Sequence, residues 1–122
     1  MSKLTKFVAP GLGLAIATAA VLASSVVNAQ TLSPAQEGRR AWLKYNCYGC
    51  HGMRAAGGMG PNVQHEGGEV REAVREGEEG GMPSYGRILT ATEITNLRAY
   101  LNSIGKAGEP TFTHWWEPVP SK

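Results

Sequence analysis

The sequence predicts a small all-α domain of three helices joined by glycine-rich loops. Three segments repeat apolar residues at helical spacing, and no segment alternates apolar and polar residues as a strand would. Sixteen glycines among 122 residues, with few large apolar side chains, leave little material for an interior. A chain of this kind needs a further group, bound or attached, to complete its core.

The first 29 residues have the pattern of a secretory signal. Lys3 and Lys6 precede an apolar stretch over 12–22, and small residues lead up to Ala29. We expect cleavage after Ala29 and export to the periplasm. The remaining ten basic residues then balance ten acidic ones, so no basic surplus would attract nucleic acid.

The exported part is expected to consist of one domain over 30–105 and an irregular tail over 106–122. A retained membrane anchor is the alternative to a cleaved signal. Residues 7–27 could just span a bilayer core of roughly 30 Å, although Pro10 and Gly13 interrupt the apolar run. The chain would contact a membrane only in that case.

The first helix is predicted over 34–46. Ser33 can cap its start, a proline occupies its first position, and Gln36 can complete a capping box. Gly38 and Trp42 lie four positions apart, so a close helix contact can sit beside a large apolar anchor.

Two further helices show the same periodicity. The second is predicted over 69–76, between glycines, and the third begins with a capping box over 90–93 and ends before Gly105. Their apolar residues recur every three or four positions, so each helix buries one face: Val70, Ala73 and Val74 in the second, and Ile94, Leu97, Tyr100, Leu101 and Ile104 in the third.

The segment Cys47–His51 reads Cys-Tyr-Gly-Cys-His, the pattern of covalent haem attachment. Two thiols three positions apart can add to the two vinyl groups at one edge of haem, which places His51 over the iron. The other ring nitrogen of His51 is expected to donate to a backbone carbonyl, for which Pro61 is the candidate. We predict one haem c with its iron, attached through Cys47 and Cys50 and ligated by His51.

Three other interpretations of the cysteine pair agree less well with the sequence than haem attachment does. A disulfide would close too small a loop to stabilise the fold much. A redox dithiol usually opens a helix after a strand, whereas this pair closes a predicted helix. A zinc site needs further regularly spaced ligands, and the other histidines, His65 and His114, are scattered.

Met82 is the predicted second axial ligand of the iron. It follows His51 by 31 positions, which is enough chain to reach the opposite face, and adjacent glycines permit close approach. Met53 is too close to His51, and Met59 lies in a loop on the same side. A thioether ligand favours Fe(II) and excludes small molecules. Without Met82 on the iron, the open position would suit a gas sensor or a weak peroxidase.

These motifs together resemble the class I cytochrome c family. The resemblance extends over about 34–103 and implies an all-α fold in which the first and last helices cross, with Gly38 and Trp42 packed against Tyr100. It also implies that the carbonyl of Pro61 holds the ligand histidine. Tyr85 is expected near the haem edge or propionates, with ordinary core packing as the alternative. The residues that carry the resemblance are Cys47–His51, Gly60–Asn62, Gly81–Pro83 and the helix over 92–101.

The resemblance implies an electron-transfer protein and not an enzyme. No nucleophile–base pair or carboxylate pair indicates catalysis. A periplasmic dehydrogenase would be the electron donor, and a terminal oxidase or another cytochrome the acceptor. A permanent subunit of a larger oxidoreductase is the alternative.

The tail over 111–118 is similar to one on small bacterial cytochromes linked to quinoprotein alcohol dehydrogenases. Trp115 and Trp116 in this tail are expected to fold back over apolar surface. The alternative is that they dock on a redox partner.

Overall fold

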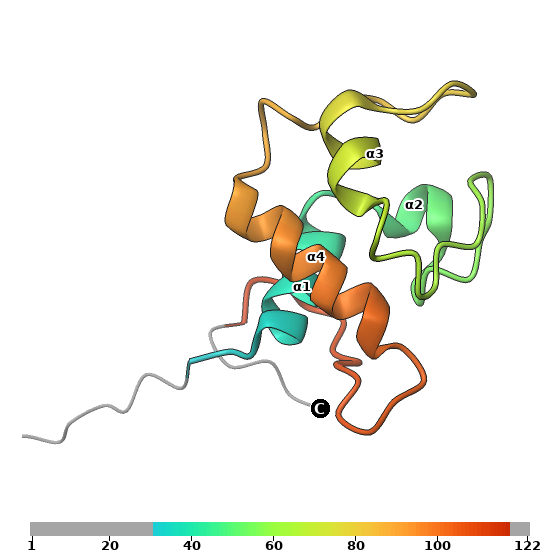
Figure 1. The fold of residues 1–122 in the computed structure, drawn as a ribbon. Helices are drawn as coiled ribbons and strands as arrows, with labels where there is room; N and C mark the ends of the chain where they lie inside the picture. The colour runs from blue at the N-terminus through green and yellow to red at the C-terminus, as the bar shows by residue number, and fades with distance from the viewer. Residues whose placement is uncertain (1–30, 118–122) are drawn as a thin grey trace, which may run out of the picture.

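The computed structural model describes residues 31–117, and within this range it contains helices and no strand. The expected signal segment, its cleavage point and the last five residues lie outside the described range. Four helices follow in order: α1 Pro34–Lys44, α2 Tyr48–His51, α3 Val70–Glu76 and α4 Ala91–Ser103 (Figure 1). The all-α prediction is confirmed.

None of the helices between residues 31 and 117 has the length and apolar character needed to cross a bilayer.

Helix α1 begins as the sequence predicts and ends slightly earlier. The Ser33 side chain accepts from the Gln36 backbone, and the Gln36 side chain accepts from the Ser33 backbone, which completes the capping box. The helix ends at Lys44, and Asn46 then adopts a left-handed conformation with φ of 58°. Asparagine tolerates this conformation better than most residues, and it turns the chain before the cysteines.

The expectation that the cysteine pair closes the first helix is therefore wrong. The turn at Asn46 separates Cys47 from α1, and Cys47 instead precedes the first residue of the short helix α2. The preceding element is still a helix and not a strand, so the arrangement also differs from the usual redox dithiol.

The other two predicted helices agree closely with the structure. Helix α3 starts at Val70, one residue later than expected, and α4 has the predicted capping box between Thr90 and Glu93. The loop from Gly77 to Tyr85 folds back on α3, because the N–H of Tyr85 donates to the carbonyl of Val74 over 2.8 Å.

Helices α1 and α4 cross each other (Figure 1). At Gly38 the two helices are too close for a side chain. A Cβ atom on Gly38 would lie 1.9 Å from the carbonyl oxygen of Asn96 and 2.8 Å from the Cβ of Tyr100. Beside this contact, the rings of Trp42 and Tyr100 pack with centroids 5.8 Å apart. The contact between a glycine and two aromatic rings, expected from the resemblance, is present.

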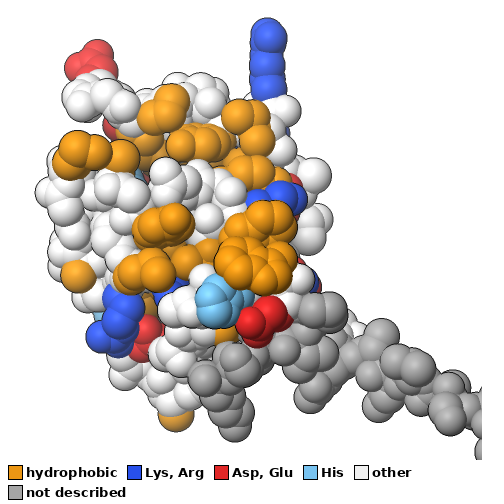
Figure 2. All heavy atoms as spheres, turned by 180° about the vertical axis from the view of Figure 1, so that it is seen from behind, with side chains coloured by type: hydrophobic (Ala, Val, Ile, Leu, Met, Phe, Trp, Pro, Cys, Tyr) orange, Lys and Arg blue, Asp and Glu red, His pale blue; other side chains and the backbone are white. Residues whose placement is uncertain are grey.

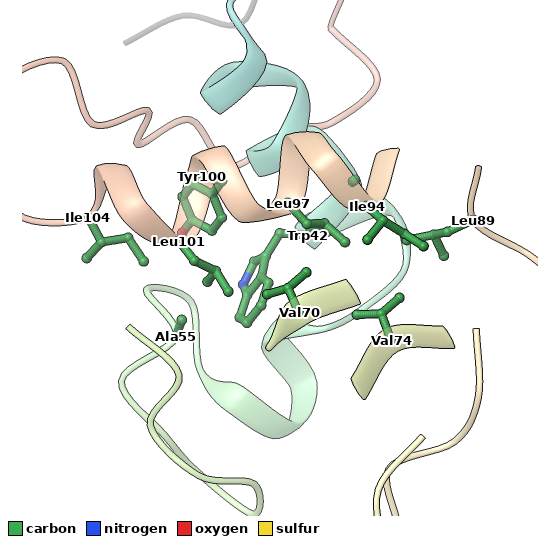
Figure 3. Close-up of a cluster of buried hydrophobic side chains, with 11 residues drawn as sticks. Trp42, Ala55, Val70, Val74, Leu89, Ile94, Leu97, Tyr100, Leu101 and Ile104 are labelled. Carbon is green, nitrogen blue, oxygen red and sulfur yellow. The ribbon is translucent and has the colours of Figure 1, made fainter. Parts of the chain in front are cut away.

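The core lies between α1, α3 and α4 (Figure 3). Trp42 extends from α1 toward α3 and the segment around α2, and the apolar side of α4 lies next to it. Tyr100 and Ile104 are fully buried. The buried cluster consists of Ala41, Trp42, Ala55, Val70, Val74, Leu89, Ile94, Leu97, Tyr100, Leu101 and Ile104.

The C-terminal tail has no helix up to Glu117, as predicted, but different residues anchor it. Phe112 is buried with 6 % of its surface exposed, whereas Trp115 and Trp116 are 38 % and 64 % exposed. The tryptophans that were predicted to fold back over apolar surface are therefore the exposed aromatic residues of the tail, and Phe112 is the buried one. Hydrophobic side chains gather on the face of the molecule seen in Figure 2, with a histidine and a carboxylate beside them.

Candidate functional site

The two cysteines lie at the start of helix α2 with free thiols. Cys47 is half-buried and Cys50 is exposed one helical turn later, where the Cys50 N–H donates to the Cys47 carbonyl. Burial raises the pKa of the Cys47 thiol to about 11; its backbone hydrogen bond opposes this rise, and Cys50 adds to it. A reactive dithiol has a cysteine with a lowered pKa, so the Cys47 thiol lacks that signature.

His51 follows directly, and its ring has a fixed orientation. The side chain is buried with 9 % exposed, and Nδ1 lies 2.9 Å from the carbonyl oxygen of Pro61. Because a carbonyl can only accept, Nδ1 carries a proton, and in the neutral imidazole the lone pair is then on Nε2. The contact expected between His51 and Pro61 is present, and it leaves Nε2 suited to bind a metal.

The loop after α2 closes around the His51 ring. A Cβ atom on Gly60 would lie 2.9 Å from Cε1 of His51, so a side chain at this position would displace the ring. The loop is held by the N–H of Gly57, which donates to the His51 carbonyl over 2.8 Å, and by the N–H of Gly60, which donates to the Cys50 carbonyl over 2.9 Å. The glycines here permit close approach to the histidine.

Trp42 supports the histidine from helix α1. Its ring lies 5.9 Å from the His51 ring, centroid to centroid. Its Nε1 is buried and has no hydrogen-bond partner among residues 31–117. A buried N–H without a partner is costly, so this side of the site has a polar atom that protein groups do not satisfy.

Tyr85 and Met82 approach from the loop after α3. Both are half-buried and pack against the core. Burial raises the pKa of the Tyr85 hydroxyl, and the nearby Cys47 and Cys50 add to the rise, so Tyr85 lies on the side of the cysteine pair. Met82 is held in a tight turn in which the N–H of Glu78 donates to its carbonyl over 3.1 Å.

The residues around the cysteines fit the expected haem. Five apolar side chains that touch the core, called the apolar rim below, are only half-buried, and two of them, Cys47 and Tyr85, lie at the cysteine pair. A flat apolar group bound there would cover the rim and complete the interior. The rim consists of Tyr45, Cys47, Val63, Met82 and Tyr85.

The other methionines and histidines of the described range, which the sequence indicates to be less suitable ligands of the iron, are exposed. Met59 is 87 % exposed and Met53 is 43 % exposed. His65 is exposed in a left-handed turn, and His114 in the tail pairs with Glu117 over 3.1 Å. Across residues 31–117, no three His, Cys, Asp or Glu side chains gather as a metal-binding group would require.

The sequence did not reveal a buried cation beside the site. Arg39 is 3 % exposed and donates to the carbonyl of Met53, two residues after His51. Arg54 makes a two-pronged ion pair with Glu109, at 2.8 and 2.7 Å, that links the same loop to the tail. No spacing rule connects residues so far apart in sequence, so neither contact had a signal in the sequence.

Known proteins resemble this chain in both sequence and fold. A family model described as cytochrome c oxidase, cbb3-type, subunit III matches residues 33–101. No curated protein matches significantly. The crystal structure of cytochrome CL from the marine methylotrophic bacterium Methylophaga aminisulfidivorans MPT aligns with a TM-score of 0.51 and 24 % identity.

The alignment with cytochrome CL covers 58 % of this chain and 53 % of the cytochrome CL chain, about half of that protein's length. At this identity it supports the fold. The family match spans both crossing helices, the cysteine pair, the His51 loop and the turn of Met82. The chain therefore belongs to the family of cytochrome c oxidase, cbb3-type, subunit III, and is a class I c-type cytochrome that carries covalently bound haem c with its iron.

Proposed function

We propose that this protein is an exported, single-haem electron carrier that works in the periplasm. It would accept one electron from a dehydrogenase and pass it to a terminal oxidase or another cytochrome. The observation that carries the proposal is the fixed ring of His51, whose Nδ1 lies 2.9 Å from the Pro61 carbonyl directly after two free thiols. Export rests on the signal pattern of residues 1–29.

The cysteines and His51 would hold the haem. Cys47 and Cys50 would form the two thioethers, and Nε2 of His51 would ligate the iron. Pro61 keeps the proton on Nδ1, which holds the histidine in the ligating tautomer and supports its basicity. Haem c supplies a one-electron couple between Fe(III) and Fe(II).

Met82 would be the second axial ligand. It is a half-buried methionine on the apolar rim, in a turn held by the Glu78 N–H, whereas Met59 is almost fully exposed. Methionine as a ligand raises the reduction potential and blocks small molecules. Ligation by Met82 would therefore favour electron carriage over gas sensing or peroxidase activity.

Tyr85 would lie at the haem edge. Its half-buried ring packs against the core on the side of the thiols, and its raised pKa keeps the hydroxyl neutral at physiological pH. A neutral hydroxyl can donate a hydrogen bond to a carboxylate such as a haem propionate. Tyr85 and the apolar rim would also exclude water from the site.

The tail offers a docking surface for the electron donor. Trp115 and Trp116 are exposed and pack edge to face, with centroids 6.0 Å apart, and His114 stacks at 4.8 Å from Trp116. Exposed tryptophans of this kind are common anchors in protein interfaces. The tail's similarity to those of cytochromes linked to quinoprotein alcohol dehydrogenases makes such a dehydrogenase the first donor to test.

A second candidate is a permanent cytochrome subunit of a larger oxidoreductase. It is favoured by the family description, which names a subunit of a cbb3-type oxidase. The two functions differ in solution: a carrier exchanges between partners, whereas a subunit copurifies with one complex. Purification of the tagged protein from its native membrane and soluble fractions distinguishes them.

The main test uses the exported protein made with a working haem-attachment system. Its N-terminal residue should be Gln30, and its reduction by a quinoprotein alcohol dehydrogenase should be followed by absorbance under stopped flow. Rapid reduction without permanent association supports the proposed carrier. No reduction by any periplasmic dehydrogenase, or a stable complex with an oxidase, contradicts it.

A further inference from the structure

Arg39 places a buried positive charge inside this small domain. It lies on α1 next to the crossing glycine and is 3 % exposed. Its guanidinium donates to the carbonyl of Phe112 over 3.1 Å, to the hydroxyl of Tyr100 over 2.6 Å and to the carbonyl of Met53. All three acceptors are neutral, so the hydrogen bonds hold the cation without neutralising it.

A carboxylate that interacts with Arg39, that of Glu109, is already engaged elsewhere. Both carboxylate oxygens of Glu109 accept hydrogen bonds from Arg54, at 2.8 and 2.7 Å. The carboxylate also accepts from the Gly105 N–H over 2.7 Å. It interacts with Arg39 only through space. A buried charge is screened weakly by salt and water, so the field of Arg39 extends into its surroundings.

The surroundings of Arg39 include the segment of the proposed iron ligand. Met53 follows His51 by two residues, which limits their Cα separation to about 7 Å. A second connection runs through ring contacts, from Tyr100 to Trp42 at 5.8 Å and from Trp42 to His51 at 5.9 Å. Arg39 therefore contacts the backbone two residues after the histidine, and it contacts Tyr100, whose ring packs on the tryptophan beside the histidine.

We propose that Arg39 is a positioning residue that raises the reduction potential of this cytochrome, and that the C-terminal tail holds it in place. Reduction adds one electron to the site and so makes it more negative by one charge. A fixed cation nearby favours that reduced state. The inference rests on the proposed ligation by His51, because the loop that Arg39 holds is the loop after that residue.

The tail contributes because it completes the burial of Arg39. The carbonyl of Phe112 accepts directly from the guanidinium, and the Phe112 side chain is buried. The pair Arg54–Glu109 fastens the tail to the loop that follows His51. Without the Phe112 contact the guanidinium would reach solvent, where its charge would be screened.

The first test compares Arg39→Gln with Arg39→Lys in the haem-loaded protein. Reduction potentials are measured by spectroelectrochemistry at low and high salt, and Arg87→Gln, an exposed arginine in another loop, is the matched control. The glutamine variant should lower the potential by a tenfold shift in the redox equilibrium, about 59 mV for one electron. The lysine variant keeps the positive charge, so its reduction potential should stay close to that of the parent protein. The control variant should have the same potential as the parent.

A second variant gives an effect of opposite sign. Glu109→Gln removes a negative charge that interacts with Arg39, so it should raise the potential, whereas a merely structural role would predict looser packing and no rise. An unchanged potential in folded Arg39→Gln protein overturns the proposal, as does a fall in Glu109→Gln. If Arg39→Gln does not fold, the sign of the Glu109→Gln shift decides alone.

Failure of the proposed ligation can be distinguished from failure of this inference. If His51 is not the ligand, the parent protein will lack a histidine-ligated haem in its magnetic resonance spectrum before any variant is compared. If that spectrum is present and the potentials do not follow the charges, only the role of Arg39 is wrong.

Discussion

Gly38 of α1 lies directly against the backbone carbonyl of Asn96 in α4. A Cβ atom at Gly38 would be 1.9 Å from this oxygen, and the oxygen belongs to a helix backbone that cannot rotate away. The position of the whole core depends on this contact, because Trp42 packs on Tyr100 beside it.

Gly38→Ala should therefore destabilise the fold strongly. Overpacking usually costs about 1–3 kcal/mol, and a clash with backbone belongs at the upper end, about 3 kcal/mol. Denaturant unfolding of the haem-loaded protein measures the change. Gly68→Ala is the control, since a Cβ atom there meets nothing within 4 Å, and it should change the free energy of unfolding by less than about 1 kcal/mol. Equal losses in the two variants would contradict the proposed crossing.

Met82→Ala should leave the haem attached but remove one of the two proposed ligands of its iron. Loss of a thioether ligand should lower the reduction potential by at least a tenfold shift in the redox equilibrium, ~59 mV, and should let carbon monoxide bind the reduced protein. Absorption spectra with and without carbon monoxide, together with redox titration, measure both effects.

Met59→Ala is the matched control for Met82, because Met59 is 87 % exposed. This variant should keep the potential of the parent protein and exclude carbon monoxide. If Met82→Ala behaves as this control does, another residue ligates the iron.

The pair Arg54–Glu109 should make stability depend on pH in the acid range. Arg54 lowers the pKa of Glu109 below its ordinary 4.5; burial opposes this shift, and the Gly105 N–H supports it. Because the folded pKa is lower than the unfolded one, the stabilisation is present above the unfolded pKa and is lost as the pH falls through the folded pKa.

Glu109→Gln should therefore lose less stability than the parent protein between about pH 6 and about pH 3. Urea unfolding at a series of pH values measures this difference. Glu76→Gln is the control, since Glu76 is exposed and forms no ion pair within residues 31–117, and it should keep the parent's slope. If the free energy of unfolding depends on pH in the same way for the parent protein and Glu109→Gln, the pair Arg54–Glu109 is not the source of the pH dependence.

Trp116→Ala, or Trp115→Ala, should weaken docking without altering the haem. A tryptophan anchor contributes about 2 kcal/mol to an interface, which corresponds to an increase in Kd of about 30-fold for the electron donor. Stopped-flow reduction by a quinoprotein dehydrogenase at varied concentration measures it, and the potential should not move.

Ile88→Ala removes an equally exposed apolar side chain outside the tail and is the control for docking. These point changes are preferable to deleting the whole tail, because the tail also carries Phe112, whose carbonyl holds Arg39. Equal reduction rates for the tryptophan variants and the control would exclude the tail as the docking surface.

Local patterns predicted most of the fold. The capping boxes at Ser33 and Thr90 fixed the starts of the long helices, because a capping residue and its partner lie three positions apart. The end of α1 was less predictable, since it depends on the backbone conformation of Asn46. The short helix α2 was missed for the same reason.

Contacts between residues far apart in the sequence could not be predicted from local sequence patterns. A contact between His51 and Pro61 could be expected, because the resemblance to class I cytochromes c implies it and both residues belong to one short segment. The burial of Arg39 depends on Phe112, which is 73 positions away. Choosing which aromatic residue of the tail would be buried required the three-dimensional packing, and the sequence alone favoured the wrong residues.

The central claim is that a haem attached through Cys47 and Cys50 completes the interior of this chain. Mass spectrometry of the denatured, exported protein, made with a working haem-attachment system, measures this most directly. We expect a mass greater than that of the chain from residue 30 onward by one haem, with Cys47→Ser and Cys50→Ser each losing a thioether bond. A protein that is folded and colourless, with the mass of the chain alone, would contradict the claim.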